Sequence, residues 1–218
     1  ECPKVCEQIS TLMPSLLYSL QESEILRVKL FGVEFISCKS GVLVTLLYHK
    51  KLDSEFEATM KKIASKLDVT ILARSRGQKL LSDELNLTDE LNIGGQIYKF
   101  SLSENAFIQP NRAVNEKMIA WAKECVQSSD DLLELYCGHG NFTIPLSFKF
   151  KNVLATEISK SSIANALKNC ELNKAKNIKF LRMDADELMS AFAGVREFNR
   201  LKDINLSDFN FSHVLVRS

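Results

Sequence analysis

The sequence predicts an α/β protein in two parts, a mixed α+β domain over residues 1–104 and a parallel-sheet domain over residues 105–218. Three observations support this prediction. The first part combines amphipathic helices with a probable hairpin, whereas after residue 130 short apolar runs alternate with segments of helical spacing. Such alternation is typical of a parallel sheet covered by helices. A chain of 218 residues, 45% of them hydrophobic, is also long enough to bury a core.

The first part is expected to combine helices with an antiparallel sheet. Its expected elements, in chain order, are a helix over 4–20, strands over 27–37 and 42–48, a helix over 53–67 and a strand over 69–73. Apolar residues three and four apart mark both helices, although Pro14 should kink the first helix or start a new one. Asp53 supplies an N-cap for the second helix, and Gly41 ends a polar turn that predicts a hairpin between the first two strands.

The second part is expected to form a parallel sheet after an introductory strand and helix. The expected elements are a strand over 97–102, a helix over 114–125, strands over 132–136, 153–158, 178–183 and 214–216, and a helix over 161–172. Each of the last four strands is a short apolar run, as in strands that are buried on both faces of a sheet. The repeated order of strand and helix therefore predicts parallel strands.

Composition and charge exclude several classes of protein. Lys and Arg number 28 against 27 Asp and Glu, so the net charge of +1 produces no long-range field, and a polyanion would have to be bound by local patches. No apolar run approaches the roughly 20 residues that span a bilayer and no signal peptide is recognisable, which predicts a cytoplasmic protein without a membrane partner. The six cysteines are scattered, so we expect free thiols and no metal site.

Two glycines one residue apart connect a probable strand to a probable helix. Gly138 and Gly140 allow this loop to approach a ligand closely at the carboxyl edge of a parallel sheet, although a tight turn that binds nothing would look the same. Glu157 ends the next strand, about 20 residues further on, where a carboxylate can accept hydrogen bonds from both ribose hydroxyls. This spacing favours a nucleoside cofactor.

The residues around the glycines favour S-adenosylmethionine over NAD. Thr143 stands where the Gly-x-Gly-x-x-Gly pattern requires its third glycine, so close packing against a pyrophosphate is poorly supported. Glu134, on the strand before the loop, would repel a phosphate but suits a cofactor with a cationic amino-acid end. Asp184, just past the third strand of the sheet, either accepts a hydrogen bond from an adenine amino group or caps the helix that begins at Ala185.

Five segments of the sequence resemble the bacterial tRNA (uracil-5-)-methyltransferases. They are 46–53 (Leu-Leu-Tyr-His-Lys-Lys-Leu-Asp), 105–111 (Asn-Ala-Phe-Ile-Gln-Pro-Asn), 132–142 (Leu-Leu-Glu-Leu-Tyr-Cys-Gly-His-Gly-Asn-Phe), 154–158 (Leu-Ala-Thr-Glu-Ile) and 194–201 (Gly-Val-Arg-Glu-Phe-Asn-Arg-Leu). Many methyltransferases share the glycine loop, whereas Gln-Pro-Asn, Tyr-His-Lys-Lys and Val-Arg-Glu-Phe-Asn-Arg narrow the resemblance to this family. The resemblance covers essentially the whole chain and implies a Rossmann-like methyltransferase domain preceded by a mixed α+β domain.

The resemblance implies an S-adenosylmethionine-dependent enzyme that methylates C5 of the uridine in the tRNA T-loop to give ribothymidine. In this family a cysteine thiolate adds to C6 of the uracil, which makes C5 nucleophilic, and a carboxylate base later removes the C5 proton. The implied partner is the T-arm of tRNA, with other RNAs that carry a T-like loop as further candidates. The target base must leave its stack to reach the methyl donor.

The resemblance also assigns cofactor-binding positions. They are Gln109, Tyr136, Gly138, Gly140, Asn141 and Glu157. Without the family, Gln109 would be interpreted as a polar loop residue, Tyr136 as a core aromatic and Asn141 as a helix cap. His139 is expected to be solvated, and Cys137 to be an unreactive small residue beside glycine.

The catalytic residues of the family have no match among these 218 residues. Its Asp-Pro-Pro-Arg motif, nucleophilic cysteine and terminal Glu base are not found, so no catalytic residue is assigned. Arg217-Ser218 resembles the tail of that motif, and we expect a methyltransferase domain truncated after its fourth strand that does not methylate uridine by itself. The alternatives are a non-catalytic RNA-binding or RNA-folding module with the same fold, and a methyltransferase of small molecules, which would leave the Tyr-His-Lys-Lys segment unexplained.

Eight basic residues are candidate contacts for RNA. Contacts with phosphates must come from local clusters, because the net charge is close to zero. Basic residues that either contact phosphates or belong to a solvated face are Lys50, Lys51, Arg74, Arg76, Lys79, Arg196, Arg200 and Lys202.

Overall fold

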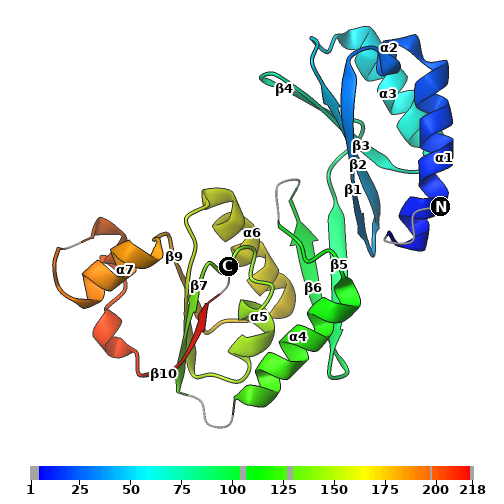
Figure 1. The fold of residues 1–218 in the computed structure, drawn as a ribbon. Helices are drawn as coiled ribbons and strands as arrows, with labels where there is room; N and C mark the ends of the chain where they lie inside the picture. The colour runs from blue at the N-terminus through cyan, green and yellow to red at the C-terminus, as the bar shows by residue number, and fades with distance from the viewer. Residues whose placement is uncertain (1–4, 104–106, 127–129, 197, 217–218) are drawn as a thin grey trace. The chain divides into compact units, whose positions relative to one another are not determined.

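The computed structural model describes residues 5–103, 107–126, 130–196 and 198–216 (Figure 1). The chain divides into two compact units, Glu1–Thr88 and Asp89–Ser218. The domain boundary predicted at residue 104 lies outside the described residues. The division between the two units comes earlier in the chain, so Ser101 belongs to the second unit. There its N donates a hydrogen bond of 2.7 Å to Asn169 Oδ1.

The first unit contains a four-stranded sheet with helices on one face (Figure 1). Its elements are α1 (Glu7–Glu22), α2 (Glu24–Arg27), β1 (Leu30–Cys38), β2 (Gly41–Tyr48), α3 (Ser54–Leu67), β3 (Thr70–Ser75) and β4 (Gln78–Leu81). The sheet order is β1-β2-β3-β4, in which β2 and β3 are parallel and the other neighbours are antiparallel. The predicted helices and hairpin are confirmed, whereas α2 and β4 have no counterpart in the prediction. Pro14 lies inside α1, so no new helix begins there.

The core of the first unit lies between the sheet and its helices. Val44 and Ile71, from neighbouring strands, belong to one buried cluster with Leu16 of α1 and Phe56 of α3. Burying a large apolar side chain contributes about 1.5–3 kcal/mol, so this face holds the helices on the sheet. Asp53 caps α3 as predicted, because its Oδ1 accepts a hydrogen bond of 2.9 Å from Phe56 N.

The second unit contains the parallel sheet. Its elements are β5 (Leu87–Ile93), which spans the division between the units, β6 (Gln96–Leu102), α4 (Arg112–Cys125), β7 (Asp131–Leu135), α5 (Thr143–Ser147), β8 (Asn152–Thr156), α6 (Lys160–Asn173), β9 (Ile178–Leu181), α7 (Ala185–Phe192), the 3-10 helices η1 (Asn199–Leu201) and η2 (Leu206–Asp208), and β10 (Phe211–Val216). The sheet order is β10-β7-β8-β9 and every pair is parallel, which confirms the prediction. β5 and β6 form a separate two-stranded sheet.

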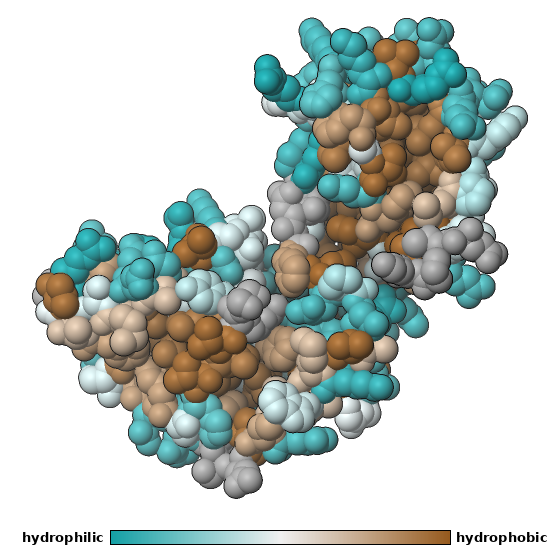
Figure 2. Space-filling view, viewed as in Figure 1, coloured by the Kyte–Doolittle hydropathy of each residue, from teal (hydrophilic) through white to brown (hydrophobic). Residues whose placement is uncertain are grey.

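β10 is at one edge of the parallel sheet in the described part of the chain. Val214 and Val216 on this strand are 60% and 61% exposed, and they alternate with half-buried residues. Figure 2 shows apolar side chains gathered over the region of β10. One face of the strand is therefore open among the described residues.

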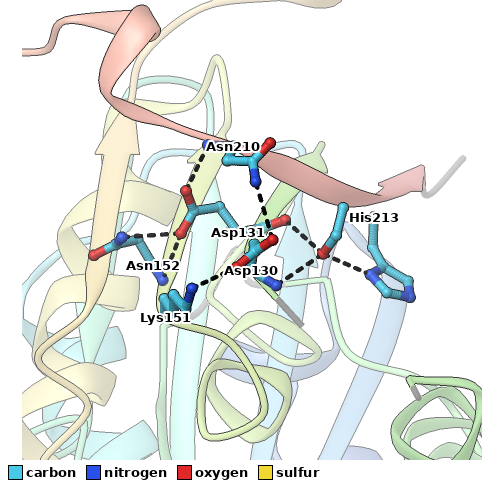
Figure 3. Close-up of polar contacts among 7 residues, drawn as sticks. Asp130, Asp131, Lys151, Asn152, Asn210 and His213 are labelled. Atoms are coloured by element: carbon cyan, nitrogen blue, oxygen red, sulfur yellow. Dashed lines mark hydrogen bonds and ion pairs between the residues drawn. The ribbon is translucent and has the colours of Figure 1, made fainter. Parts of the chain in front are cut away.

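A polar network holds the amino ends of three strands together (Figure 3). Asp131, which is buried at the start of β7, accepts hydrogen bonds through Oδ1 from the N and the Nδ2 of Asn152, each at 2.9 Å. Its Oδ2 accepts from Asn210 N, just before β10, at 2.7 Å. The neighbouring Asp130 accepts from Lys151 and from Asn210 Nδ2. Because the strands are parallel, their carboxyl ends all lie on the side of the sheet opposite to this network, and that side is called the carboxyl edge.

Three further observations concern the described residues alone. None of their helices combines the length and hydrophobicity that crossing a bilayer requires. No group of three or more His, Cys, Asp or Glu side chains among them is arranged to hold a metal ion. Cys2 lies outside the described residues, and the described cysteines all carry free thiols; they are Cys6, Cys38, Cys125, Cys137 and Cys170.

Candidate functional site

The loop between β7 and α5 holds three residues in the left-handed region of the backbone. The angle φ is 59° at Tyr136, 60° at Gly138 and 89° at Gly140. A Cβ atom at Gly140 would lie 3.1 Å from Ile144 Cδ1, whereas a Cβ atom at Gly138 would meet nothing within 4 Å. Glycine is therefore favoured at 140 by backbone and packing, and at 138 by the backbone alone. The positive φ of Tyr136 costs about 1–2 kcal/mol, which the surrounding structure must offset.

Glu157 joins the carboxyl end of β8 to this glycine loop. Its Oε2 accepts a hydrogen bond of 3.0 Å from Gly138 N, and its Oε1 accepts one of 2.8 Å from Ser159 N. The structure thus brings together two residues that sequence spacing alone had paired. Each carboxylate oxygen has two lone pairs, so both oxygens of this half-buried side chain can accept a further hydrogen bond.

Asn141 fixes the other end of the loop. Its side chain is buried and exchanges two hydrogen bonds of 2.9 Å with the side chain of Asn115 on α4. It does not cap α5, because Phe142 occupies the N-cap position. Sequence reasoning missed Asn115. The pattern that could have identified Asn115 is a polar residue on the buried face of α4, one turn before the buried Ile119.

Tyr136 and Gln109 lie on different segments of the second unit. The Tyr136 side chain is 43% exposed, so it is not an ordinary core aromatic. Gln109 is half-buried in the coil before α4, which Asn111 caps by accepting a hydrogen bond of 3.1 Å from Val114 N. Asn105 and Ala106, which begin the Gln-Pro-Asn segment, lie outside the described residues.

Asp184 caps α7 through a reciprocal pair of hydrogen bonds. Its Oδ1 accepts from Glu187 N at 2.8 Å, and Glu187 Oε2 accepts from Asp184 N at 3.4 Å. This is a capping box, which satisfies backbone donors at the start of the helix. The capping interpretation of Asp184 is confirmed, and its contact with adenine remains a prediction.

The expectation of a solvated His139 is wrong. This residue is buried, and its ring lies edge-on to Phe100 of β6 with 5.8 Å between the centroids. Its carbonyl oxygen accepts a hydrogen bond of 3.0 Å from Asn169 Nδ2 on α6. The loop is therefore anchored by its middle residue as well as by its ends. Cys137 is also buried, as its predicted inert role requires.

The Tyr-His-Lys-Lys segment in the first unit has two faces. Tyr48 is buried and donates a hydrogen bond of 2.7 Å to Leu26 O, and Lys50 donates to Ile25 O. Burial lowers the pKa of Lys50, against the opposing effect of Asp53. Lys50 is thus tied to the chain itself, which was not foreseen for a candidate RNA contact.

His49 in the same segment is exposed and stacks on the exposed ring of Phe31. The two ring centroids are 3.9 Å apart and the ring planes are inclined by 15°. Phe31 is 56% exposed although its side chain is large and apolar. An exposed planar pair of this kind offers a surface on which another ring can stack. Phe31 was not singled out from the sequence.

The other candidate RNA contacts differ in their surroundings. Lys51, Arg76, Lys79 and Lys202 are exposed, whereas Arg74 is half-buried in β3. Arg196 and Arg200 both form ion pairs with Glu187 on α7. The charges of these two arginines are therefore partly neutralised within the second unit.

Comparison with known proteins decides the family. A model of the tRNA (Uracil-5-)-methyltransferase family matches residues 1–218. The chain belongs to this family. Its resemblance to the family, which rested on five segments of the sequence, is thereby confirmed.

Individual members of the family are similar along almost the whole chain. The tRNA/tmRNA (uracil-C(5))-methyltransferase of Campylobacter concisus (strain 13826) is 89% identical over 216 residues, which are 99% of this chain and 59% of that protein. The protein of the same name from Sulfurimonas denitrificans (strain ATCC 33889 / DSM 1251) is 48% identical over 218 residues, again 59% of its length. The chain thus spans about three-fifths of the curated relatives that it matches.

A solved structure shares the fold. The crystal structure of Pyrococcus abyssi tRNA (uracil-54, C5)-methyltransferase in complex with S-adenosyl-L-homocysteine has a TM-score of 0.59, with 16% identity. The likeness covers 77% of this chain and 44% of that chain. It confirms the predicted fold class, which is α/β with a Rossmann-like methyltransferase domain.

Proposed function

We propose that the protein to which these residues belong methylates C5 of a uridine in the T-loop of tRNA and takes the methyl group from S-adenosylmethionine. Membership of the tRNA (uracil-5-)-methyltransferase family supports the reaction. The bridge from Glu157 to Gly138 supports the cofactor, because it sets a carboxylate against an open glycine loop at the carboxyl edge of the sheet. A cytoplasmic location would follow from the tRNA substrate.

The residues of the loop fit this cofactor by their chemistry. The Glu157 carboxylate is an acceptor for two ribose hydroxyls, and the free space at Gly138 admits a ligand close to the backbone. Among the described residues, Thr143 Oγ1 at the end of the loop is buried without a hydrogen-bond partner, a polar atom that the protein alone leaves unsatisfied. When bound, S-adenosylmethionine would supply an electrophilic methyl group.

The other predicted residues are assigned supporting roles. We place Tyr136, Asn141 and Gln109 at the amino-acid end of the cofactor and Asp184 at its adenine. Asn141 is held by Asn115, so its position is set before any ligand binds. Such preorganisation reduces the entropy that binding costs.

The stacked pair of Phe31 and His49 is the candidate contact for RNA in the first unit. Proteins that bind looped RNA commonly stack unpaired bases on aromatic side chains. Exposed basic residues such as Lys51 and Arg76 are available in the same unit for phosphates. In this assignment Tyr48 and Lys50 of the Tyr-His-Lys-Lys segment stabilise the fold, whereas His49 and Lys51 contact RNA.

The decisive experiment replaces Glu157 by Ala in the full-length protein. The fold should persist and the affinity for S-adenosylmethionine should fall by about 1–3 kcal/mol in calorimetry, the scale of charge-assisted hydrogen bonds. Glu171→Ala is the matched control, because it removes an exposed glutamate from α6 of the same unit. Unchanged affinity in Glu157→Ala would remove Glu157 from the site.

A second measurement separates an enzyme from an RNA-folding module. The full-length protein is incubated with T-arm RNA and S-adenosylmethionine, and the RNA is digested and analysed for ribothymidine by mass spectrometry. We expect ribothymidine at the T-loop position. Binding of the T-arm RNA without any methylation would favour the non-catalytic alternative.

A further inference from the structure

The two arginines of the Val-Arg-Glu-Phe-Asn-Arg segment meet one glutamate. Arg200 donates through Nη2 to Glu187 Oε1 and through Nη1 to the carbonyl oxygen of Arg182. Arg196 is more distant, with its Nη2 3.7 Å from the same Glu187 oxygen and its guanidinium 4.2 Å from the centre of the Phe198 ring. Arg200 therefore forms two hydrogen bonds with the surrounding protein, whereas Arg196 forms a longer ion pair and a contact with an aromatic ring.

Both points that Arg200 holds flank Asp184. Arg182 precedes Asp184 by two residues and directly follows β9. Glu187 uses its other oxygen, Oε2, to accept from Asp184 N and close the capping box. The hydrogen bond from Arg200 is also the main cause that holds the pKa of Glu187 below its usual value.

The same connection reaches the loop that carries Glu157. Arg182 Nε donates a hydrogen bond of 3.1 Å to the carbonyl oxygen of Ile158, the residue after Glu157. A continuous path thus runs from Arg200 through Arg182 to the end of β8. The residues proposed to bind the ribose and the adenine are joined by this path at the carboxyl edge of the sheet.

We propose that Arg200 is a positioning residue for the cofactor site, which holds the loop of Asp184 in place beside the loop of Glu157. This inference rests on the proposed cofactor site. It differs from a role in contacting RNA phosphates, which the positive charge alone would suggest. The contacts favour positioning, because a phosphate at Arg200 would compete with the carboxylate of Glu187 and with the Arg182 carbonyl.

The test compares Arg200→Gln with Arg196→Gln in the full-length protein. Both changes remove one positive charge from the same segment, but Arg196→Gln leaves both hydrogen bonds of Arg200 intact. S-adenosylmethionine affinity is measured by calorimetry, KM is measured separately for the cofactor and for tRNA, and RNA affinity is measured over a range of salt concentrations.

We expect Arg200→Gln to weaken cofactor binding and raise the cofactor KM about tenfold. The KM for tRNA and the slope of log K against log salt should not change, and Arg196→Gln should alter cofactor binding by less than about twofold. If Arg200→Gln lowers the unfolding temperature, Arg200→Lys decides. Lysine keeps a positive charge beside Glu187 but lacks the second nitrogen that reaches the Arg182 carbonyl. A cofactor affinity between those of the wild type and Arg200→Gln supports the inference, and an unaltered affinity overturns it.

Two other outcomes would overturn the inference. The first is unchanged cofactor affinity in Arg200→Gln while Glu157→Ala still weakens binding, which leaves the proposed site intact and removes Arg200 from it. The second is a loss of RNA affinity with a smaller salt slope and normal cofactor binding, which makes Arg200 a phosphate contact. If Glu157→Ala also has no effect, the proposed cofactor site fails as well.

Discussion

Asn169 joins the glycine loop to β6. Its Nδ2 donates to the carbonyl oxygen of His139 at 3.0 Å, and its Oδ1 accepts from Ser101 N at 2.7 Å. Asn165 and Asn173, one turn away on either side, bind the carbonyl oxygens of Ser101 and Lys99. One face of α6 thus satisfies the backbone of β6 as a neighbouring strand would.

Asn169→Leu should destabilise the protein by about 2–4 kcal/mol, because it leaves a buried N–H and a buried carbonyl without their partner. The free energy of unfolding is measured by urea denaturation. Asn173→Leu is the matched control, and we expect a smaller loss because Asn173 is only half-buried and does not touch the glycine loop. Equal losses would show that the contact with His139 adds nothing.

Asp131→Asn should cost about 1–3 kcal/mol of stability. The carboxylate accepts three hydrogen bonds from Asn152 and Asn210, and an amide must turn its NH₂ group toward at least one of those donors. Asp130→Asn should cost less than about 1 kcal/mol, since that side chain is more exposed and its ion pair with Lys151 lies at the surface. Chemical denaturation compares the two variants, and the reverse order would contradict the role given to Asp131.

Gly138→Ala and Gly140→Ala should have different main effects. Both residues have positive φ, so each change strains the backbone by about 1 kcal/mol. A methyl group at 140 also crowds Ile144, so Gly140→Ala should be the more destabilising variant in thermal unfolding. Gly138→Ala places its methyl group in open space, where the proposed cofactor approaches, and should weaken cofactor binding more than stability. Normal cofactor affinity in Gly138→Ala would argue against that approach.

Cys170 should resist alkylation while Cys125 reacts. Burial, aided by the charge of Glu171, raises the pKa of Cys170 to about 11, whereas Cys125 is exposed. At pH 8 the Cys170 thiolate is therefore scarce as well as inaccessible. Treatment of the folded protein with iodoacetamide, followed by peptide mass spectrometry, gives the two rates. Similar rates would mean that α6 opens readily.

The raised pKa of Cys170 also has a consequence for stability. The folded value lies above the unperturbed value of 9.0, so the neutral thiol is favoured in the folded state. The contribution of this preference to the free energy of unfolding is complete below pH 9 and is lost as the pH rises toward 11. Cys170→Ser should reduce the loss of stability between these two pH values, as measured by urea denaturation at each pH.

Phe31→Ala and His49→Ala should each weaken T-arm RNA binding by about 1–3 kcal/mol, the scale of one stacked base. The salt dependence should not change, because neither substitution removes a phosphate contact. Tyr18→Ala is the control, since Tyr18 is also an exposed aromatic of the first unit but has no stacking partner among the described residues. Binding is measured by fluorescence anisotropy, and an equal effect of Tyr18→Ala would rule out a specific role for the stacked pair.

Local patterns in the sequence were sufficient for much of the fold. The cap at Asp53 and the hairpin turn that ends at Gly41 depend on residues close together in the chain, and both were predicted correctly. The parallel sheet followed from the alternation of apolar runs with helical spacing. The position of Glu157 near the glycine loop also followed, because consecutive parallel strands end on the same side of a sheet, whereas the hydrogen bond from Gly138 N to Glu157 is seen only in the structure.

Contacts between distant segments were decided only by the tertiary structure. His139 looked like a solvated loop residue, and it is buried because β6 and α6 close over it. Asn115 and Asn141 are far apart in sequence, and no local pattern states that their side chains meet. Charge alone made Arg200 a surface cation, whereas folding sets Glu187 beside it. Periodicity identifies a buried face of an element, but it does not identify the residue on the other element that the face will meet.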